Sequence, residues 1–145
     1  MGRSLKFLLF LVGVVVLAVT ACASAAKLTP AREVTVDGKS YRVVTVTQLK
    51  TMLVSKDFLL VNVHTPYAGE IKGTDLFLLY NQIEQNLSKL PADKSAKIVV
   101  YCRSGTMSGI AAKTLARLGY TNVTDVEGGM AAWEKEGYPL VQSPK

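Results

Sequence analysis

Cysteine and histidine are scarce in this chain of 145 residues, which contains two cysteines and one histidine. His64 has no second histidine with which to share a metal ion, and Cys22 and Cys102 lie far apart. The Cys/His clusters of zinc and iron sites are therefore missing, and we expect no metal centre. Lysine and arginine also form no block interleaved with aromatic residues, so nucleic acid is not an expected partner.

Repeats and low-complexity stretches are absent as well. The length suffices for one domain with a hydrophobic core and not for two. We expect a leader or anchor over residues 1–26, a tether over residues 27–33 and one domain over residues 34–145. The net charge of +6 falls to about +4 without the leader, which gives only a weak bias toward anions or a lipid surface.

The first residues have the pattern of an export signal. Arg3 and Lys6 precede the apolar run 7–19, which is the order of charged and hydrophobic regions in a signal peptide. Residues 19–22, Val-Thr-Ala-Cys, resemble the lipobox of bacterial lipoproteins, in which the cysteine is acylated and becomes the new N-terminus. We therefore expect lipidation of Cys22.

Two other fates of this segment stay open. Cleavage at the small residues 23–25 would release a soluble protein. Residues 7–26 carry no charge and are just long enough to remain as a membrane span. All three outcomes place the domain outside the cytoplasm, and we favour a lipid anchor in the bacterial cell envelope, on its periplasmic or extracytoplasmic face. If Cys22 is acylated or removed, Cys102 has no partner for a disulfide within the chain.

A predicted strand, loop and helix surround Cys102. The β-branched and aromatic run 98–101 predicts a buried strand. Apolar residues at helical spacing over 108–118 predict a helix that Gly119 ends. Backbone N–H groups of the loop and the positive end of the helix dipole would converge on the sulfur and favour a thiolate. This pattern makes Cys102 a candidate nucleophile.

An isolated cysteine at a strand end is usually an inert core residue. The residues that follow argue against this interpretation, because a packed core does not need small, polar and charged side chains at a helix start. We call residues 102–108 the Cys102 loop. Its candidate substrate-binding residues are Arg103, Ser104, Gly105, Thr106, Met107 and Ser108.

The Cys102 loop, Cys-Arg-Ser-Gly-Thr-Met-Ser, resembles the active-site loop of the rhodanese family of sulfurtransferases, which often reads Cys-Arg-Ser-Gly-x-Arg-Ser. Residues 127–133 and 137–139 are similar to the closing Gly-Gly-x-x-x-Trp and Gly-x-Pro element of the family. A weaker match joins residues 59–64 and 69–74 to the family's Leu-Ile-Asp-Val-Arg strand and Gly-His-Ile-Pro-Gly-Ala turn. Together the matches span nearly the whole expected domain.

The resemblance implies a rhodanese-like α/β fold of three layers, with a mostly parallel central sheet flanked by helices. It also implies a sulfurtransferase that needs no metal or organic cofactor. The Cys102 thiolate would take the outer sulfur of a small sulfur anion such as thiosulfate, or of a persulfide donor. It would carry this sulfur as a cysteine persulfide and pass it to a thiol or a protein acceptor. A low-turnover sulfur-relay or protein-binding module of the same fold stays open as the alternative.

Four positions bear on this resemblance. Asn62 and His64 stand where the family usually has aspartate and arginine, which removes a charged pairing and leaves the chemistry in place. Met107 replaces an arginine, so the loop has one cation fewer for a dianion. Related phosphatases of the cell-cycle type need an arginine where this chain has Ser108, so we do not expect phosphatase activity.

The other expected elements alternate between strands and helices, which is typical of an α/β fold with a mostly parallel sheet. In such sheets ligands bind at the carboxyl ends of the strands, where Cys102 falls. After a hairpin around Asp37-Gly38, we expect strands at 43–46, 58–63, 75–80, 98–101 and 122–126. We expect helices from a Thr47 cap to 54, and over 81–90, 108–118 and 130–136.

Overall fold

The computed structural model describes residues 30–142 of the chain. The predicted leader over residues 1–26, with Cys22, lies outside the described residues, as does the first part of the tether. Within residues 30–142, no helix is both long and apolar enough to cross a membrane.

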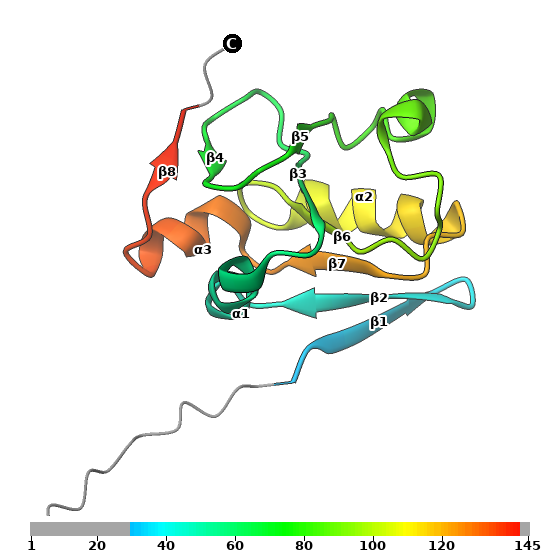
Figure 1. The fold of residues 1–145 in the computed structure, drawn as a ribbon, viewed down its shortest axis with the longest axis horizontal. Coiled ribbons are helices and arrows are strands. Elements are labelled where there is room, and N and C mark those ends of the chain that lie inside the picture. The colour runs from blue at the N-terminus through cyan, green and yellow to red at the C-terminus, as the bar shows by residue number, and fades with distance from the viewer. Residues whose placement is uncertain (1–29, 143–145) are drawn as a thin grey trace, which may run out of the picture.

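A six-stranded sheet with the order β1-β2-β7-β6-β3-β5 runs through the domain (Figure 1). Its strands are β1 (Arg32–Val36), β2 (Lys39–Val44), β3 (Leu59–Asn62), β5 (Leu76–Phe77), β6 (Ile98–Tyr101) and β7 (Val123–Val126). The hairpin β1–β2 is antiparallel, with Arg32 opposite Val43, and every other pairing is parallel. The expected mostly parallel sheet, the hairpin and the central place of strand 98–101 are therefore confirmed.

Helices cover both faces of the sheet. Side chains of β6 alternate between two cores, because successive residues of a strand point to opposite faces. Ile98 and Val100 pack in the core that includes α2 (Thr106–Arg117), and Val99 and Tyr101 pack in the core that includes α1 (Val46–Met52) and α3 (Gly129–Lys135). The three expected layers are present.

The start of the first helix differs from the prediction by two residues. Thr45, and not Thr47, is the N-cap of α1, and its hydroxyl accepts a hydrogen bond from the N–H of Gln48 at 3.2 Å. The Gln48 side chain accepts one in return from the Thr45 N–H at 2.8 Å. This reciprocal capping box also ends the preceding strand at Val44. A 3-10 turn, η1 (Leu53–Ser55), follows the helix.

The ends of α2 have different causes. The helix begins at Thr106, two residues earlier than expected, directly after Gly105 in the left-handed conformation. Its last residue is Arg117, one residue earlier than expected, and Gly119, whose φ is 93°, closes it as predicted. The N–H groups of Gly119 and Tyr120 both donate at 3.1 Å, to the carbonyls of Ala116 and Leu115. This pair of bonds forms a Schellman motif.

The stretch from residue 75 to residue 90 was predicted wrongly. The expected strand over 75–80 is reduced to the two residues of β5, and the expected helix is the 3-10 segment η2 (Glu84–Lys89). Asn86, with φ −121° and ψ 27°, interrupts η2. A second small sheet was not predicted: β4 (Glu70–Ile71) pairs antiparallel with β8 (Leu140–Val141).

Candidate active site

Cys102 directly follows the central strand β6 and lies at the carboxyl end of the parallel strands. Its residue surface is 1% exposed, and it packs in the same core as Val100 and α2. The N–H of Gly105 donates a hydrogen bond to the Cys102 sulfur at 3.0 Å. Among residues 30–142, Cys102 is the free cysteine.

The start of α2 supplies further N–H groups near this sulfur. Gly105 is the N-cap and has a left-handed backbone with φ 96°, which favours glycine, and it provides no side-chain cap. The first helical bond runs from the Gly109 N–H to the Gly105 carbonyl at 3.0 Å. The amides of residues 106–108 precede that bond and have no partner of their own within the helix. The Cys102 loop therefore presents donors and a helix dipole to an anion.

The start of α3 holds the Cys102 loop in place. The N–H groups of Met130 and Ala131 donate to the carbonyls of Cys102 and Arg103 at 2.8 and 2.9 Å. A side chain at Gly129 would place its Cβ 2.0 Å from the Cys102 carbonyl oxygen, so only glycine fits there. The structure thus brings together the two strongest motifs of the sequence, the Cys102 loop and the Gly-Gly pair before α3.

The predicted substrate-binding residues have different environments. Arg103, Ser104 and Thr106 are exposed, and Met107 is half-buried against the α2 core. Ser108 is fully buried, and its hydroxyl donates to the Gly105 carbonyl at 3.3 Å. Arg103 also forms an ion pair with Glu134 of α3 at 3.8 Å, which ties this residue to the helix that holds the loop.

The weaker third motif forms the support beside β6. Asn62 is fully buried; its amide donates to the Gly69 carbonyl and its oxygen accepts from the His64 N–H, both at 3.0 Å. An asparagine therefore satisfies two backbone groups without the charged pairing of the family pattern. His64 is half-buried, and its Nδ1 has no hydrogen-bond partner. Burial, and then the nearby charge of Arg103, lower the pKa of His64.

Asp125 of β7 is a residue that the sequence analysis missed. It is 6% exposed, and its Oδ1 has no hydrogen-bond partner. Burial raises the pKa of Asp125 to about 6, while the nearby Ser108 side chain and Val126 backbone oppose this rise. An acid within a predicted strand of a parallel sheet, whose strands are usually buried on both faces, was the signal that could have found it.

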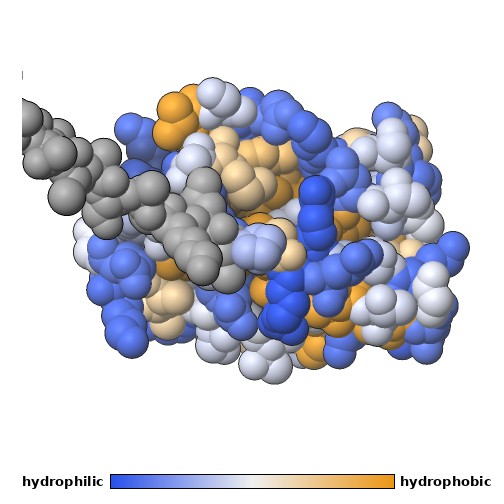
Figure 2. Space-filling model, turned by 90° about the horizontal axis from the view of Figure 1, so that it is seen from below, coloured by the Kyte–Doolittle hydropathy of each residue, from blue (hydrophilic) through white to orange (hydrophobic). Residues whose placement is uncertain are grey.

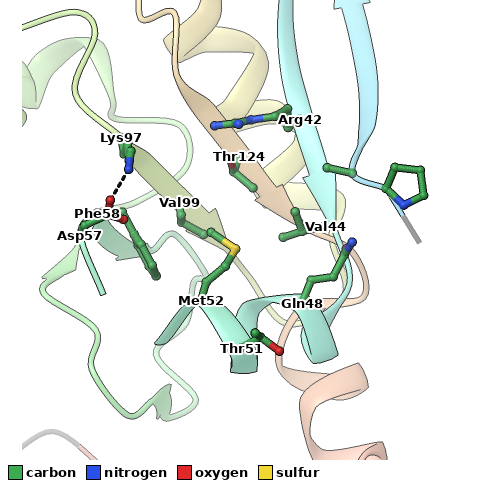
Figure 3. A pocket seen from close by; sticks show the side chains of 12 residues that line it. Arg42, Val44, Gln48, Thr51, Met52, Asp57, Phe58, Lys97, Val99 and Thr124 are labelled. Atoms are coloured by element: carbon green, nitrogen blue, oxygen red, sulfur yellow. Dashed lines mark hydrogen bonds and ion pairs between the residues drawn. The ribbon is translucent and has the colours of Figure 1, made fainter. Parts of the chain in front are cut away.

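A separate pocket of about 490 Å³ opens on the other face of the sheet, which α1 and α3 cover in part. Val44, Val99 and Thr124 form part of its wall, with Met52 and Phe58 beside them (Figure 3). Figure 2 shows hydrophobic surface between hydrophilic side chains when the molecule is seen from below. Cys102 does not line this pocket, so the pocket is not the candidate active site.

The described residues offer no alternative centre based on a metal. No group of three His, Cys, Asp or Glu side chains in residues 30–142 could hold a metal ion. What the site provides is a buried sulfur at a helix start, with a backbone N–H in contact with it. Such an arrangement can stabilise a negative charge on that sulfur or on an atom bonded to it.

Comparison with known proteins agrees with this geometry. The sequence model of the rhodanese-like domain family matches residues 45–136. A sulfurtransferase from Allochromatium vinosum is 36% identical over 89 residues, which cover 60% of this chain and 81% of that protein. Other curated relatives are matched over 14% to 39% of their own length.

Solved structures are similar over about two thirds of the chain. The crystal structure of a rhodanese-related protein from Thermoplasma volcanium has a TM-score of 0.61 and 27% identity, covering 71% of this chain and all of that one. A Rhodopseudomonas palustris protein of unknown function, described as a possible tyrosine phosphatase, has a TM-score of 0.57 and 26% identity over 66% of this chain and 81% of its own. The expected rhodanese-like α/β fold is therefore confirmed.

Proposed function

Because the chain belongs to the rhodanese-like domain family, we propose that it is an exported sulfurtransferase that carries sulfane sulfur as a persulfide on Cys102. The observation that carries this proposal is the 3.0 Å contact between the Gly105 N–H and the Cys102 sulfur at the start of α2. The similarity to a protein named sulfurtransferase supports it.

The reaction needs no redox partner. The Cys102 thiolate attacks the outer sulfur of a donor, for example thiosulfate, and the sulfur–sulfur bond of the donor breaks. Sulfite leaves with the electron pair of that bond, and Cys102 keeps the outer sulfur as an anionic persulfide. An acceptor thiolate then attacks the terminal sulfur, takes it as a new persulfide and restores the Cys102 thiolate. Charge and atoms balance in both steps.

The chain's own groups stabilise the anion that both steps share. The outer sulfur would lie where the amides of residues 106–108, which have no partner within the helix, and the positive end of α2 converge. Because Cys102 is buried, the field of these groups is weakly screened by water. The exposed Arg103 would attract anionic donors to the mouth of the site.

Phosphatase chemistry is less well supported, although one structural relative is described as a possible tyrosine phosphatase. Phosphatases of the cell-cycle type need an arginine at the position of residue 108, which holds a buried serine in this chain. The alternative within the family is a low-turnover sulfur-relay or protein-binding module. It differs from an enzyme in the rate of turnover and not in fold.

Intact-mass spectrometry tests the proposal. We expect the reduced wild-type protein to gain the mass of one sulfur atom after treatment with thiosulfate or polysulfide, and to lose it again when a thiol is added. Cys102→Ser should gain nothing, whereas Cys22→Ser should behave like the wild type. If the wild type gains no sulfur, or Cys102→Ser gains as much, the proposal is wrong. Loading with negligible turnover would favour the relay module.

We further propose that the domain works in the bacterial cell envelope, attached through a lipid on Cys22. The support for this is the lipobox-like segment after a short apolar run in the sequence. The small sulfur donor and the thiol or protein acceptor would then be met outside the cytoplasm.

A further inference from the structure

The proposed mechanism leaves one buried ionisable group without a role, Asp125. It lies between β2 and β6 in the sheet, in register with Val43 and Val100. Val43, Val100 and Cys102 belong to the same core, so this register points Asp125 to the face that carries α2 and the sulfur. Its Oδ2 lies only 3.7 Å from the position of a Cβ on Gly109, in the first turns of α2.

Ser108 connects this carboxyl group to the Cys102 loop. Its hydroxyl donates to the Gly105 carbonyl at 3.3 Å, and Ser108 also lies close enough to the Asp125 carboxyl to lower the pKa of Asp125. A hydroxyl has one hydrogen and can donate to only one of these acceptors at a time. Gly105 is the residue whose N–H contacts the Cys102 sulfur. Ser108 therefore lies between the Asp125 carboxyl group and the residue that contacts the sulfur.

The protonation state of Asp125 decides where the Ser108 hydrogen goes. A protonated carboxyl can donate to the Ser108 oxygen, so that Ser108 donates to Gly105. An ionised carboxylate only accepts, and it binds a donor more strongly than a neutral carbonyl does. It therefore takes the Ser108 hydrogen and leaves the Gly105 carbonyl with the Gly109 N–H alone.

We propose that Asp125 is a positioning residue of the sulfur site, which acts through Ser108 on Gly105 and makes the Cys102 anion less stable when Asp125 is ionised. Both consequences of ionisation destabilise the Cys102 anion. Gly105 loses a hydrogen bond that fixes it beside the sulfur, and a negative charge appears in the same core as the Cys102 anion. The inference deepens the proposed function, but its test needs no sulfur donor.

The charged and titratable groups around Asp125 influence the pH at which its carboxyl group ionises. Burial raises the pKa of Asp125 to about 6. Glu127, just after β7, adds to this rise, and Arg32 of β1 opposes it. Tyr41 of β2 faces the same carboxyl group, whose charge adds to the effect of burial in raising the pKa of Tyr41. From α2 the contacting polar group is the neutral hydroxyl of Ser108.

Alkylation of Cys102 by iodoacetamide measures the reactive thiolate directly. The full-length reduced protein is treated from pH 4.5 to 9, and peptide masses distinguish Cys102 from Cys22. We expect the wild-type rate to show two inflections, of which the lower one reflects Asp125. In Asp125→Asn the lower inflection should disappear. Below the midpoint of the upper inflection, its rate should exceed that of the wild type by about tenfold, the effect expected of one nearby charge.

Three further variants and one measurement complete the test. Ser108→Ala should reduce the lower inflection by at least half, and the double variant with Asp125→Asn should match Asp125→Asn within twofold. Asp57→Asn, which removes an exposed carboxylate before β3, should leave the profile unchanged. In the wild type, the NMR titration of the Asp125 carboxyl carbon should have the same midpoint as the lower inflection, and this check does not depend on a variant folding.

Several results would overturn the inference. A lower inflection that persists in Asp125→Asn, or whose midpoint differs from the NMR titration, would exclude Asp125. An undiminished inflection in Ser108→Ala would exclude Ser108 as the link. Because no sulfur is transferred, these results stand whether or not Cys102 later proves to carry a persulfide.

Discussion

Met107 belongs to the Cys102 loop and lies in the first turn of α2. Its side chain is half-buried and packs against the core that α2 shares with the sheet. A thioether is polarisable and carries no charge. The rhodanese pattern often has an arginine here, so a cation that could bind a dianionic donor is missing from this loop.

Met107→Arg should therefore change the preference between donors. A charge-assisted contact contributes about 1.5–3 kcal/mol, which corresponds to a gain of about ten- to a hundredfold in the use of thiosulfate. A persulfide donor carries less charge and should gain less. Steady-state kinetics with thiosulfate and with a persulfide donor measure the two effects.

Ile110→Arg is the matched control for this prediction. Ile110 lies one turn further along α2 and is 44% exposed, so the variant adds the same charge outside the first turn. We expect its thiosulfate kinetics to change by less than about twofold, because exposed charges are well screened. An equal gain in both variants, or none in Met107→Arg, would mean that Met107 serves packing alone.

At the scale of single residues, the sequence predicts site residues that lie together in one contiguous segment. Cys102 and the donors after it could be predicted, because strand, loop and helix start are contiguous in the chain. Asp125 could not, because its contact with Ser108 depends on the register of β7 beside β6 and on the packing of α2 over both. Such contacts between distant segments leave no periodic pattern.

Among the elements, α3 has the closest contact with the reactive loop. Its first residue, Gly129, approaches the Cys102 carbonyl so closely that no side chain fits, and Met130 donates to the same oxygen. Gly137, at the other end of α3, has a left-handed φ of 79°, and a Cβ added there would meet no atom within 4 Å. Gly129 also has a positive φ, 51°, so the two glycines share the backbone strain and differ in the steric contact.

Gly129→Ala should lower the free energy of unfolding by about 2–4 kcal/mol, because its new methyl group forces α3 and the Cys102 loop apart. Gly137→Ala should cost only about 1–2 kcal/mol, from the left-handed backbone. Urea unfolding measures both values. Alkylation of Cys102 should change in Gly129→Ala and stay as in the wild type in Gly137→Ala. Equal losses of stability would contradict the close contact of α3 with the loop.

The elements that could be predicted have a repeated internal pattern. The buried strands and α2 show it, and Gly119 marks the helix end. The stretch before Pro91 lacks such a pattern. It packs against the α2 core through Leu78, Ile83 and Leu90, which are not at helical spacing. The pairing of β4 with β8 joins two-residue segments far apart in the chain, too short for any periodicity. The Thr45 cap had a sequence signal, Gln48 three residues later.

At the largest scale, residues 30–142 form a domain with two cores, and the predicted leader precedes the described residues. We expect metabolic labelling with radioactive palmitate to mark the wild-type protein through Cys22. Cys22→Ser should lose the label and the processing of the leader, whereas Cys102→Ser should keep both. Unchanged label and processing in Cys22→Ser would exclude lipidation and favour a retained membrane span.

The direction of β1 has a consequence for how such a domain would be oriented. Because β1 runs antiparallel to β2, with Arg32 opposite Val43, the chain enters the sheet at the edge where the parallel strands end. Cys102 lies at that same edge. A domain held through its amino end would turn its reactive edge toward the point of attachment. Pro30 follows Cys22 by eight positions, and this stretch spans at most about 30 Å, so donor and acceptor would meet the sulfur in a narrow zone next to the membrane surface.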